Sequence, residues 1–361
     1  MKSIPFYSGL GLLALLASCS VYKNAPIDLN AEEAAWRQES GAIGRNTAVT
    51  QVQARQIGLI LNPDLNKARL KLASSKEAAK QAGWWNDPSF SWDIEQVLQE
   101  NTLNMSGSLG FTIPVTGLPA LEKKVAEQYK EADFWMLRQA ELDFLRSLDQ
   151  AWSKLMGMHP SSAPRLRFLT GQGFSLPAAV AAPSPAALME SPKVKAQMAT
   201  YATTETLLKT EIRRQYPELE LGPSFTRDDE EKEVGGEIGF NIPLWNRNRK
   251  AIAEARGVRN TARLETVQLW KTELFNARQL EATQQMVIRH CRTELQRMES
   301  FSSSVQTMEK LHGIGEASLL ELAENRHQLY ESRLAFLDSL DKLLGIQAQL
   351  RYITHANLQS K

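Results

Sequence analysis

The feature that most restricts the fold of this chain is an internal duplication with an offset of 129 residues. Three pairs of prolines coincide at this offset: Pro63 with Pro192, Pro88 with Pro217, and Pro114 with Pro243. The segments 107–114 (GSLGFTIP) and 236–243 (GEIGFNIP) are also identical at five of eight positions. Because proline makes up only about 5% of average sequences, three coincidences at one offset are rare by chance. We therefore predict two copies of a unit built as helix, strand, loop, strand and helix.

Four segments alternate apolar and polar side chains, which is the pattern of β-strands with two different faces. The predicted strands are about 88–98, 105–114, 217–226 and 234–243. Each is roughly ten residues long, the length of a tilted transmembrane strand. Alternation alone favours a soluble antiparallel sheet with one buried face, whereas the lipid anchor and the long helices described below favour transmembrane strands.

The polar faces of these segments carry acidic residues and no lysine or arginine. The acidic residues are Asp93, Glu95, Glu218, Glu220 and Glu237. If the strands span a membrane, several chains must share one barrel, because four strands cannot close and an open sheet edge in lipid leaves backbone groups unpaired. Two chains would give an eight-stranded barrel, whose interior is filled by side chains. Three chains would give a 12-stranded barrel, which leaves an open lumen. Such a lumen should tolerate cations better than anions.

The helices are predicted from apolar residues that recur at steps of three and four. Their approximate ranges are 119–156, 244–311 and 318–355. No proline follows Pro243, so the second helix can reach roughly 100 Å at 1.5 Å per residue. Gly313 and Gly315 interrupt the pattern and predict a hairpin turn. A plain coiled-coil stalk would show the same periodicity, so only the connection to strands separates the two interpretations.

The N-terminus has the pattern of a secretory signal. Lys2 precedes an apolar run over 4–17, which is too short to span a bilayer. The run ends in Leu-Ala-Ser-Cys19, which resembles a bacterial lipobox and implies removal of residues 1–18 and acylation of Cys19. Ser20 then implies the outer membrane, by resemblance to Gram-negative lipoproteins. The alternative is an ordinary signal peptide with a chance cysteine. The other cysteine, Cys291, is predicted to be a packed and inert thiol.

Composition and motifs argue against several classes of function. The chain has 42 basic and 41 acidic residues, a balance that disfavours nucleic-acid binding. It contains no Gly-x-Ser-x-Gly, His-Glu-x-x-His or phosphate-loop motif, so we predict no enzyme, no catalytic residue and no cofactor. Glu309 to His312 and Glu324 to His327 each read Glu-x-x-His, a di-iron signature. Across a hairpin their offset is roughly 16 Å, which disfavours a shared metal site.

Several motifs in order resemble the outer-membrane efflux protein family, the TolC-type channels. They are Asn62-Pro-Asp-Leu65, the duplicated Gly-Phe-x-Ile-Pro strand ends, Pro243-Leu-Trp-Asn-Arg-Asn-Arg249 and Gly313-Ile-Gly-Glu-Ala-Ser-Leu-Leu-Glu-Leu322. The resemblance covers nearly all of residues 19–361. It implies an α+β membrane protein whose homotrimer forms a 12-stranded barrel continued by a long α-helical coiled-coil tunnel in the periplasm. The Leu-Trp-Asn-Arg-Asn-Arg sequence is most similar to that of the outer components of cation-efflux pumps.

The implied function is the exit duct of a tripartite efflux system that exports small solutes, such as metal cations or drugs. Its partners would be a periplasmic adaptor, an inner-membrane transporter and outer-membrane lipid, with no nucleic acid. The repeats cover about 58–157 and 187–361, joined by a Pro- and Ala-rich linker at 158–190. Each half of the family carries a hairpin that reaches the periplasmic tip, but here the first is shortened. The alternative function is a periplasmic coiled-coil scaffold lipoprotein without a channel.

The resemblance also assigns candidate site residues, none of which is a metal ligand. Glu321 and Glu324 match acidic residues at the channel entrance, although a solvated helix face is the usual fate of such charges. The candidate adaptor-docking tip comprises Gly313, Gly315, Glu316 and Ser318. The candidate junction of barrel and tunnel comprises Asn246, Arg247, Asn248 and Arg249, with a helix cap at Asn246 as the alternative. Trp84 and Trp85 fit an interfacial aromatic belt, or simple packing.

Overall fold

The computed structural model describes residues 22, 24–42, 49–97, 102–158, 176–227, 231–240 and 245–353. The chain divides into two compact units, Met1–Thr50 and Gln51–Lys361. The first unit contains the helix α2 (Leu29–Ala42), which follows Asp28. The Asp28 carboxylate accepts hydrogen bonds from the backbone N–H groups of Asn30 and Ala31, at 3.0 and 3.3 Å. The predicted signal sequence and the acylated Cys19 lie outside the described residues.

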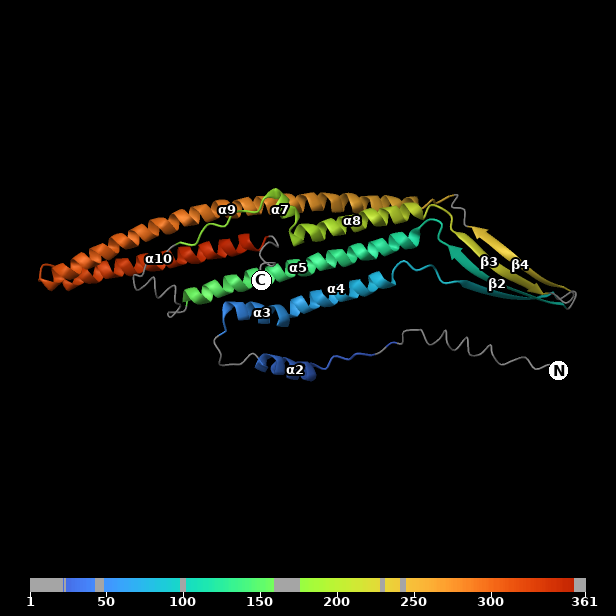
Figure 1. Ribbon diagram of the computed structural model, residues 1–361, viewed down its shortest axis with the longest axis horizontal. Coiled ribbons are helices and arrows are strands. Elements are labelled where there is room, and N and C mark those ends of the chain that lie inside the picture. The colour runs from blue at the N-terminus through green and yellow to red at the C-terminus, as the bar shows by residue number, and fades with distance from the viewer. Residues whose placement is uncertain are drawn as a thin grey trace. The chain divides into compact units, whose positions relative to one another are not determined.

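The second unit is an α+β arrangement of long helices and one sheet (Figure 1). Its helices are α3 (Gln51–Leu61), α4 (Pro63–Gln81), α5 (Leu118–Met158), α7 (Pro185–Met189), α8 (Pro192–Arg213), α9 (Arg249–Gly313) and α10 (Leu319–Arg351). Its strands are β1 (Ser89–Val97), β2 (Thr102–Ile113), β3 (Leu219–Arg227) and β4 (Lys232–Phe240). Within this unit the sheet lies at one end of the helices and the α9–α10 turn at the other (Figure 1).

The 129-residue offset matches two equivalent helix starts. The Asn62 side chain accepts hydrogen bonds from the backbone N–H groups of Asp64 and Leu65, at 2.9 and 3.1 Å, and so caps α4. Ser191 caps α8 in the same way, and a proline occupies the first turn of each helix. Each helix leads into a β-hairpin and then into a long helix, α5 or α9. The coincidence of Pro63 with Pro192 therefore reflects shared helix-start chemistry.

All four predicted strands are present, in one antiparallel sheet of order β1-β2-β3-β4. β2 begins at Thr102, earlier than the expected residue 105, because the hairpin pairing continues to Val97 and Thr102. Residues 241–244, which include the expected end of the last strand, lie outside the described part of the chain. The two outer strands, β1 and β4, each have one unpaired edge within the described sheet.

The two hairpins differ in register by two residues. Ser89 pairs with Gly110, and the positions 129 residues later are Glu218 and Gly239. Gly239 pairs instead with Glu220. A shift of one residue would have moved every side chain to the opposite face, whereas a shift of two leaves each on its original face. The polar and apolar faces therefore continue unbroken across all four strands.

Helix α8 packs between α5 and α9, and its buried face is rich in threonine. The hydroxyls of Thr203, Thr206 and Thr210 donate to carbonyl oxygens four residues earlier, at 2.9, 3.1 and 3.0 Å. These bonds satisfy the buried hydroxyls within the helix itself. The larger apolar core lies between α9 and α10, where Ile288, Cys291, Phe336, Leu340 and Leu343 form one cluster. Cys291 is packed there as predicted, and burial raises the pKa of its thiol.

Part of the expected linker is bound to the helices. Residues 176–184, which we call the strap, run without helix or strand before α7. The fully buried Gln284 accepts a hydrogen bond from the Val180 N–H at 2.9 Å and donates one to the Val180 carbonyl at 2.8 Å. Gln347 of α10 donates to the Ala178 carbonyl at 3.0 Å. Leu176 packs against the α9–α10 core. The strap is therefore fixed to the long hairpin of the second half, α9 and α10.

Replacing Gln284 with leucine should weaken this attachment, because both backbone groups of Val180 would lose their partner. We expect the free energy of unfolding to fall by about 2 kcal/mol, measured by denaturant unfolding in detergent. Gln279→Leu, an exposed position on the same helix, is the matched control and should change stability by less than about 0.5 kcal/mol. Equal effects of the two substitutions would contradict the attachment.

A polar cluster joins α3, α5 and the end of α10. The Asp149 carboxylate accepts hydrogen bonds from Arg55 at 2.9 and 2.6 Å, from Gln51 at 3.0 Å and from the Tyr352 hydroxyl at 2.6 Å. Burial, together with the bond to Asp149, raises the pKa of Tyr352 to about 12. The hydroxyl therefore remains a donor across the physiological range.

The raised pKa of Tyr352 predicts a loss of folding stability at alkaline pH. The unfolded tyrosine ionises near pH 10, whereas Tyr352 holds its proton in the folded protein up to about 12. Its contribution to stability is therefore complete below pH 10 and is lost as the pH rises from about 10 to about 12. We expect the melting temperature to fall over this window, and less steeply in Tyr352→Phe. Tyr330→Phe, at an exposed position, should keep the wild-type slope. Identical slopes in all three proteins would contradict this role.

Among the described residues, the long hairpin is formed by α9 and α10 of the second half. α9 has 65 residues and α10 has 33, whereas α5 has 41. Residues 159–175, between α5 and the strap, lie outside the described part of the chain. At the α9–α10 turn, Gly315 has φ +79° and its N–H donates to the His312 carbonyl at 3.1 Å. Glycine suits this helix end because it has no Cβ to oppose a positive φ.

Candidate functional site

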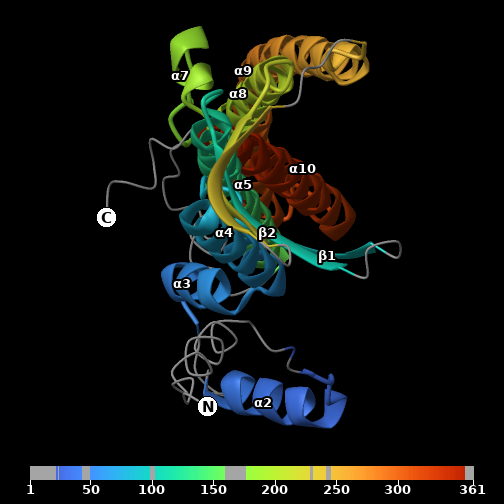
Figure 2. The same cartoon turned by 90° about the vertical axis from the view of Figure 1, so that its right-hand side faces the viewer.

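One face of the sheet exposes a continuous apolar surface. Its exposed side chains are Phe90, Trp92, Ile94, Phe111, Val234, Ile238 and Phe240, which are 44–82% exposed. They come from β1, β2 and β4, so the surface extends from one edge strand to the other. Figure 2 shows the strands from the sheet end of the second unit, where they curve away from the helix ends. Apolar surfaces of this extent mark contact with a membrane or a partner.

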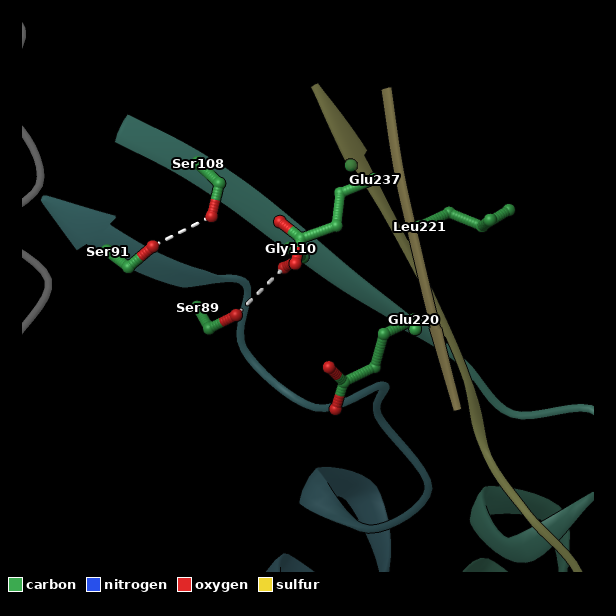
Figure 3. A pocket seen from close by; sticks show the side chains of 9 residues that line it. Ser89, Ser91, Ser108, Gly110, Glu220, Leu221 and Glu237 are labelled. Carbon is green, nitrogen blue, oxygen red and sulfur yellow. Dashed lines mark hydrogen bonds between the residues drawn. The ribbon is translucent and has the colours of Figure 1, made fainter. Parts of the chain in front are cut away.

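The opposite face is polar and acidic. Asp93, Glu95, Glu220 and Glu237 all lie on it, by their pairing with Ser106, Asn104, Gly239 and Gly222. Glu218 lies one residue before β3 and is half-buried. A shallow hollow on this face is lined by serines and carboxylates (Figure 3). In it the hydroxyls of Ser91 and Ser108 are 2.7 Å apart, and Leu221 points away. The described part of this face contains no lysine or arginine.

Glu233 is a further acidic residue on this face that the sequence analysis missed. The predicted strand began at residue 234, but β4 begins at Lys232 and Glu233 pairs with Thr226. Its position could have been found from the alternation, because Glu233 and Glu237 are four residues apart and both oppose the apolar Val234 and Ile238.

At the hairpin, Glu321 helps to cap the N-terminus of α10. Its carboxylate accepts hydrogen bonds from the Ser318 backbone N–H and hydroxyl, both at 2.8 Å, while the Ser318 hydroxyl accepts from the Glu321 N–H at 3.2 Å. This is a capping box at the start of α10. The backbone and side-chain bonds from Ser318 hold the pKa of Glu321 below its usual range. Glu324 lies almost one turn further along, with an exposed side chain.

The turn itself carries exposed apolar side chains beside the predicted glycines. Ile314, Leu319 and Leu320 are 69–70% exposed. Gly313 ends α9, and the Glu316 N–H donates to the Leu311 carbonyl at 2.9 Å. The tip therefore combines a hydrogen-bonded turn with an exposed apolar surface. The sequence did not predict this apolar surface, because helical periodicity does not extend into a turn.

The junction between β4 and α9 is built differently from the expected cap. The residue that precedes α9 is Asn248, with φ 51°, so a cap at Asn246 is wrong. Asn248 does not cap the helix. Its side-chain amide instead donates to the carbonyl and carboxylate of Glu211, at 2.9 and 2.7 Å, and so ties α9 to the end of α8. Asparagine tolerates the left-handed conformation better than most residues. The neighbouring Arg247 and Arg249 have exposed side chains.

No helix in the described ranges is both long and apolar enough to cross a bilayer. The described residues also contain no group of three or more His, Cys, Asp or Glu side chains placed to share a metal ion. The two Glu-x-x-His segments therefore do not come together as a metal site within the part of the chain that is described.

The chain is similar in structure to known outer-membrane channels. It matches the outer-membrane channel OprN with a TM-score of 0.66 and 14% identity, over 88% of this chain and 91% of that chain. It matches the Campylobacter jejuni CmeC outer membrane channel with a TM-score of 0.65 and 12% identity, over 93% and 89%. It matches CusC with a TM-score of 0.60 and 13% identity, over 93% of this chain and 95% of that chain. No family model and no curated protein matches the sequence.

These identities are low, but the matches cover most of both chains, so the shared feature is the whole arrangement of helices and strands. The chain therefore has the fold of these outer-membrane channels, as its sequence motifs predicted.

Proposed function

We propose that this chain is the subunit of a homotrimeric outer-membrane channel, the exit duct of a tripartite system that exports small solutes from the periplasm to the exterior. The observation that carries the proposal is the sheet. It has an exposed apolar face, an acidic face and two open edges, and it continues directly into long helices.

The open edges argue for shared strands. Backbone N–H and C=O groups along the free edges of β1 and β4 would each cost several kcal/mol if they entered lipid unpaired. Pairing β4 of one copy with β1 of the next removes every edge. Three copies then give 12 strands, with the apolar faces toward lipid and the acidic faces toward a lumen. Acylated Cys19 would anchor each copy at the same membrane.

The acidic face supports cations or neutral molecules as cargo. Asp93, Glu95, Glu220 and Glu237, joined by Glu233, would line the lumen without any opposing basic charge. Metal cations and cationic drugs are both compatible with such a lumen, which disfavours anions. Transport of this kind requires no covalent chemistry from the chain.

The hairpin supports a partner at the periplasmic end. The tip at Gly313, Gly315, Glu316 and Ser318, with its exposed Ile314, Leu319 and Leu320, offers an apolar surface to a periplasmic adaptor. The adaptor would connect the channel to an inner-membrane transporter that supplies the energy. A trimer would present three long hairpins, one from each copy. The Glu324 side chain is exposed and can face the channel entrance. The Glu321 carboxylate accepts two hydrogen bonds from Ser318, and these bonds compete with a role at the entrance.

The test is conductance of the purified mature protein in planar lipid bilayers, together with its migration in detergent before and after heating. We expect discrete channels, cation selectivity and a heat-sensitive oligomer. A protein that stays monomeric and dissolved without detergent would support the scaffold lipoprotein instead.

A further inference from the structure

The four connections between helices and strands are gathered at one level of the second unit. Gly83, after α4, packs so closely on the first turn of α5 that an added Cβ would lie 2.8 Å from Lys123 Cβ. Arg214, after α8, lies 3.8 Å from the Glu122 carboxylate of α5. Asn248, before α9, is bonded to Glu211 of α8. These contacts link the sheet-facing ends of α4, α5, α8 and α9 in sequence (Figure 1).

Every one of these connections exposes an aromatic or apolar side chain. They are Trp84 and Trp85 before β1, Val115 after β2, Tyr216 before β3 and Trp245 before α9, with exposures of 56–79%. Side chains of this kind normally pack inside a soluble protein, and tryptophan and tyrosine favour the boundary between lipid and water. Here they stand where the apolar sheet face ends and the polar helices begin.

The same level is positively charged. We define the junction belt as the four connections with the two adjoining turns of each helix, residues 75–88, 114–124, 207–218 and 245–255. The junction belt holds ten lysines and arginines against six aspartates and glutamates, a formal charge of +4, while the whole chain has +1. On the polar face of the described sheet, every charged residue is acidic. Basic charge is therefore concentrated at this level.

Most of the acidic residues of the junction belt are already paired. Glu77 pairs with Lys80, Glu254 with Lys250, and both Glu122 and Glu211 with Arg214. Several exposed cations of the junction belt form no ion pair with a carboxylate among the described residues, including Lys123, Lys124, Arg213, Arg247 and Arg249. They share the level of the four connections with the exposed aromatic side chains.

We propose that the junction belt binds anionic phospholipids, with their phosphate groups on these cations and their acyl chains against the adjoining apolar face of the sheet. The inference rests on the proposed function, because it needs the sheet to lie in a bilayer. Arginine pairs with phosphate in a bidentate manner, and each cation near an anionic surface favours binding by roughly fivefold at low salt. The aromatic rings fix the depth at which the cations meet the headgroups.

The experiment measures quenching of tryptophan fluorescence in the full mature protein, reconstituted in phosphatidylcholine vesicles. A fixed fraction of the lipid carries brominated chains, on either phosphatidylglycerol or phosphatidylcholine. The test variant combines K123Q, K124Q, R247Q and R249Q. The matched control is R289Q with R292Q, which removes exposed arginines of α9 outside the junction belt. Conductance is recorded for each protein to establish that it is folded and inserted.

We expect brominated phosphatidylglycerol to be preferred over brominated phosphatidylcholine by about fivefold or more in the wild type and in the control. The preference should fall to about one in the test variant, and in the wild type at high salt. A wild type that conducts but quenches equally with both lipids overturns the inference and leaves the channel intact. An unchanged preference in the test variant overturns it as well. Absence of quenching by either lipid contradicts the channel itself.

Discussion

Gly222→Ala is expected to abolish the proposed channel by breaking the sheet between its two halves. Gly222 lies in β3 opposite Glu237 of β4, and on its other side it faces β2. A Cβ at this position would overlap the Leu109 carbonyl oxygen and would stand 2.8 Å from the Leu109 carbonyl carbon. The obstacle is backbone, so no rotation of a side chain can relieve it. We expect a loss of about 3 kcal/mol of stability, and with it the heat-sensitive oligomer and the conductance.

The control for this change lies in the neighbouring strand. At Gly236 the nearest atom to an added Cβ is the Gly222 carbonyl oxygen at 3.9 Å, an ordinary contact. Gly236→Ala should therefore alter stability by less than about 0.5 kcal/mol and leave conductance unchanged. If both alanine variants conduct like the wild type, the close approach of β2 and β3 does not exist in the assembled protein.

Glu220→Lys combined with Glu237→Lys should reverse the ion selectivity of the proposed channel. The two carboxylates lie on the acidic face of adjacent strands and open onto the hollow in Figure 3. Each copy would exchange two negative charges for two positive ones, in a lumen that has no other basic residue in the described strands. We expect the permeability ratio of cation to anion to change by about tenfold or more, equivalent to about 1.4 kcal/mol, measured as the reversal potential in a salt gradient.

Two comparisons make this result specific. The neutral pair Glu220→Gln and Glu237→Gln should give an intermediate ratio. Glu265→Lys with Glu299→Lys makes the same change of charge at exposed positions of α9, outside the sheet, and should shift the ratio less. A ratio that responds equally to charges on α9 and on the sheet would show that the acidic face does not border the conducting path.

The fold could be anticipated from the sequence because its main signals are local. Alternation located the four strands, and the prolines after Asn62 and Ser191 marked two helix starts with the same capping chemistry. The absence of proline after Pro243 allowed the 65 residues of α9. Each of these rules concerns neighbours in the chain, so a single sequence suffices to apply them.

Other features depend on which segments meet in space, and sequence patterns could not supply them. The two-residue difference in register between the hairpins follows from strand pairing. The binding of the strap by Gln284 joins residues 104 positions apart. Glu321 was predicted as an entrance residue from its place in a motif, but its bonds to Ser318 show a capping task that competes with that role. Asn248 was grouped with the junction residues, while its contact with Glu211 became visible only in the fold.

The bonds of Gln347 to the strap and of Tyr352 to Asp149 have a consequence for biogenesis. Because a polypeptide is synthesised from its N-terminus, Ala178 and Asp149 lack these partners until residues 347–352 have been made. Premature termination upstream of Gln347 would leave a product without either bond, which proteases would degrade more readily.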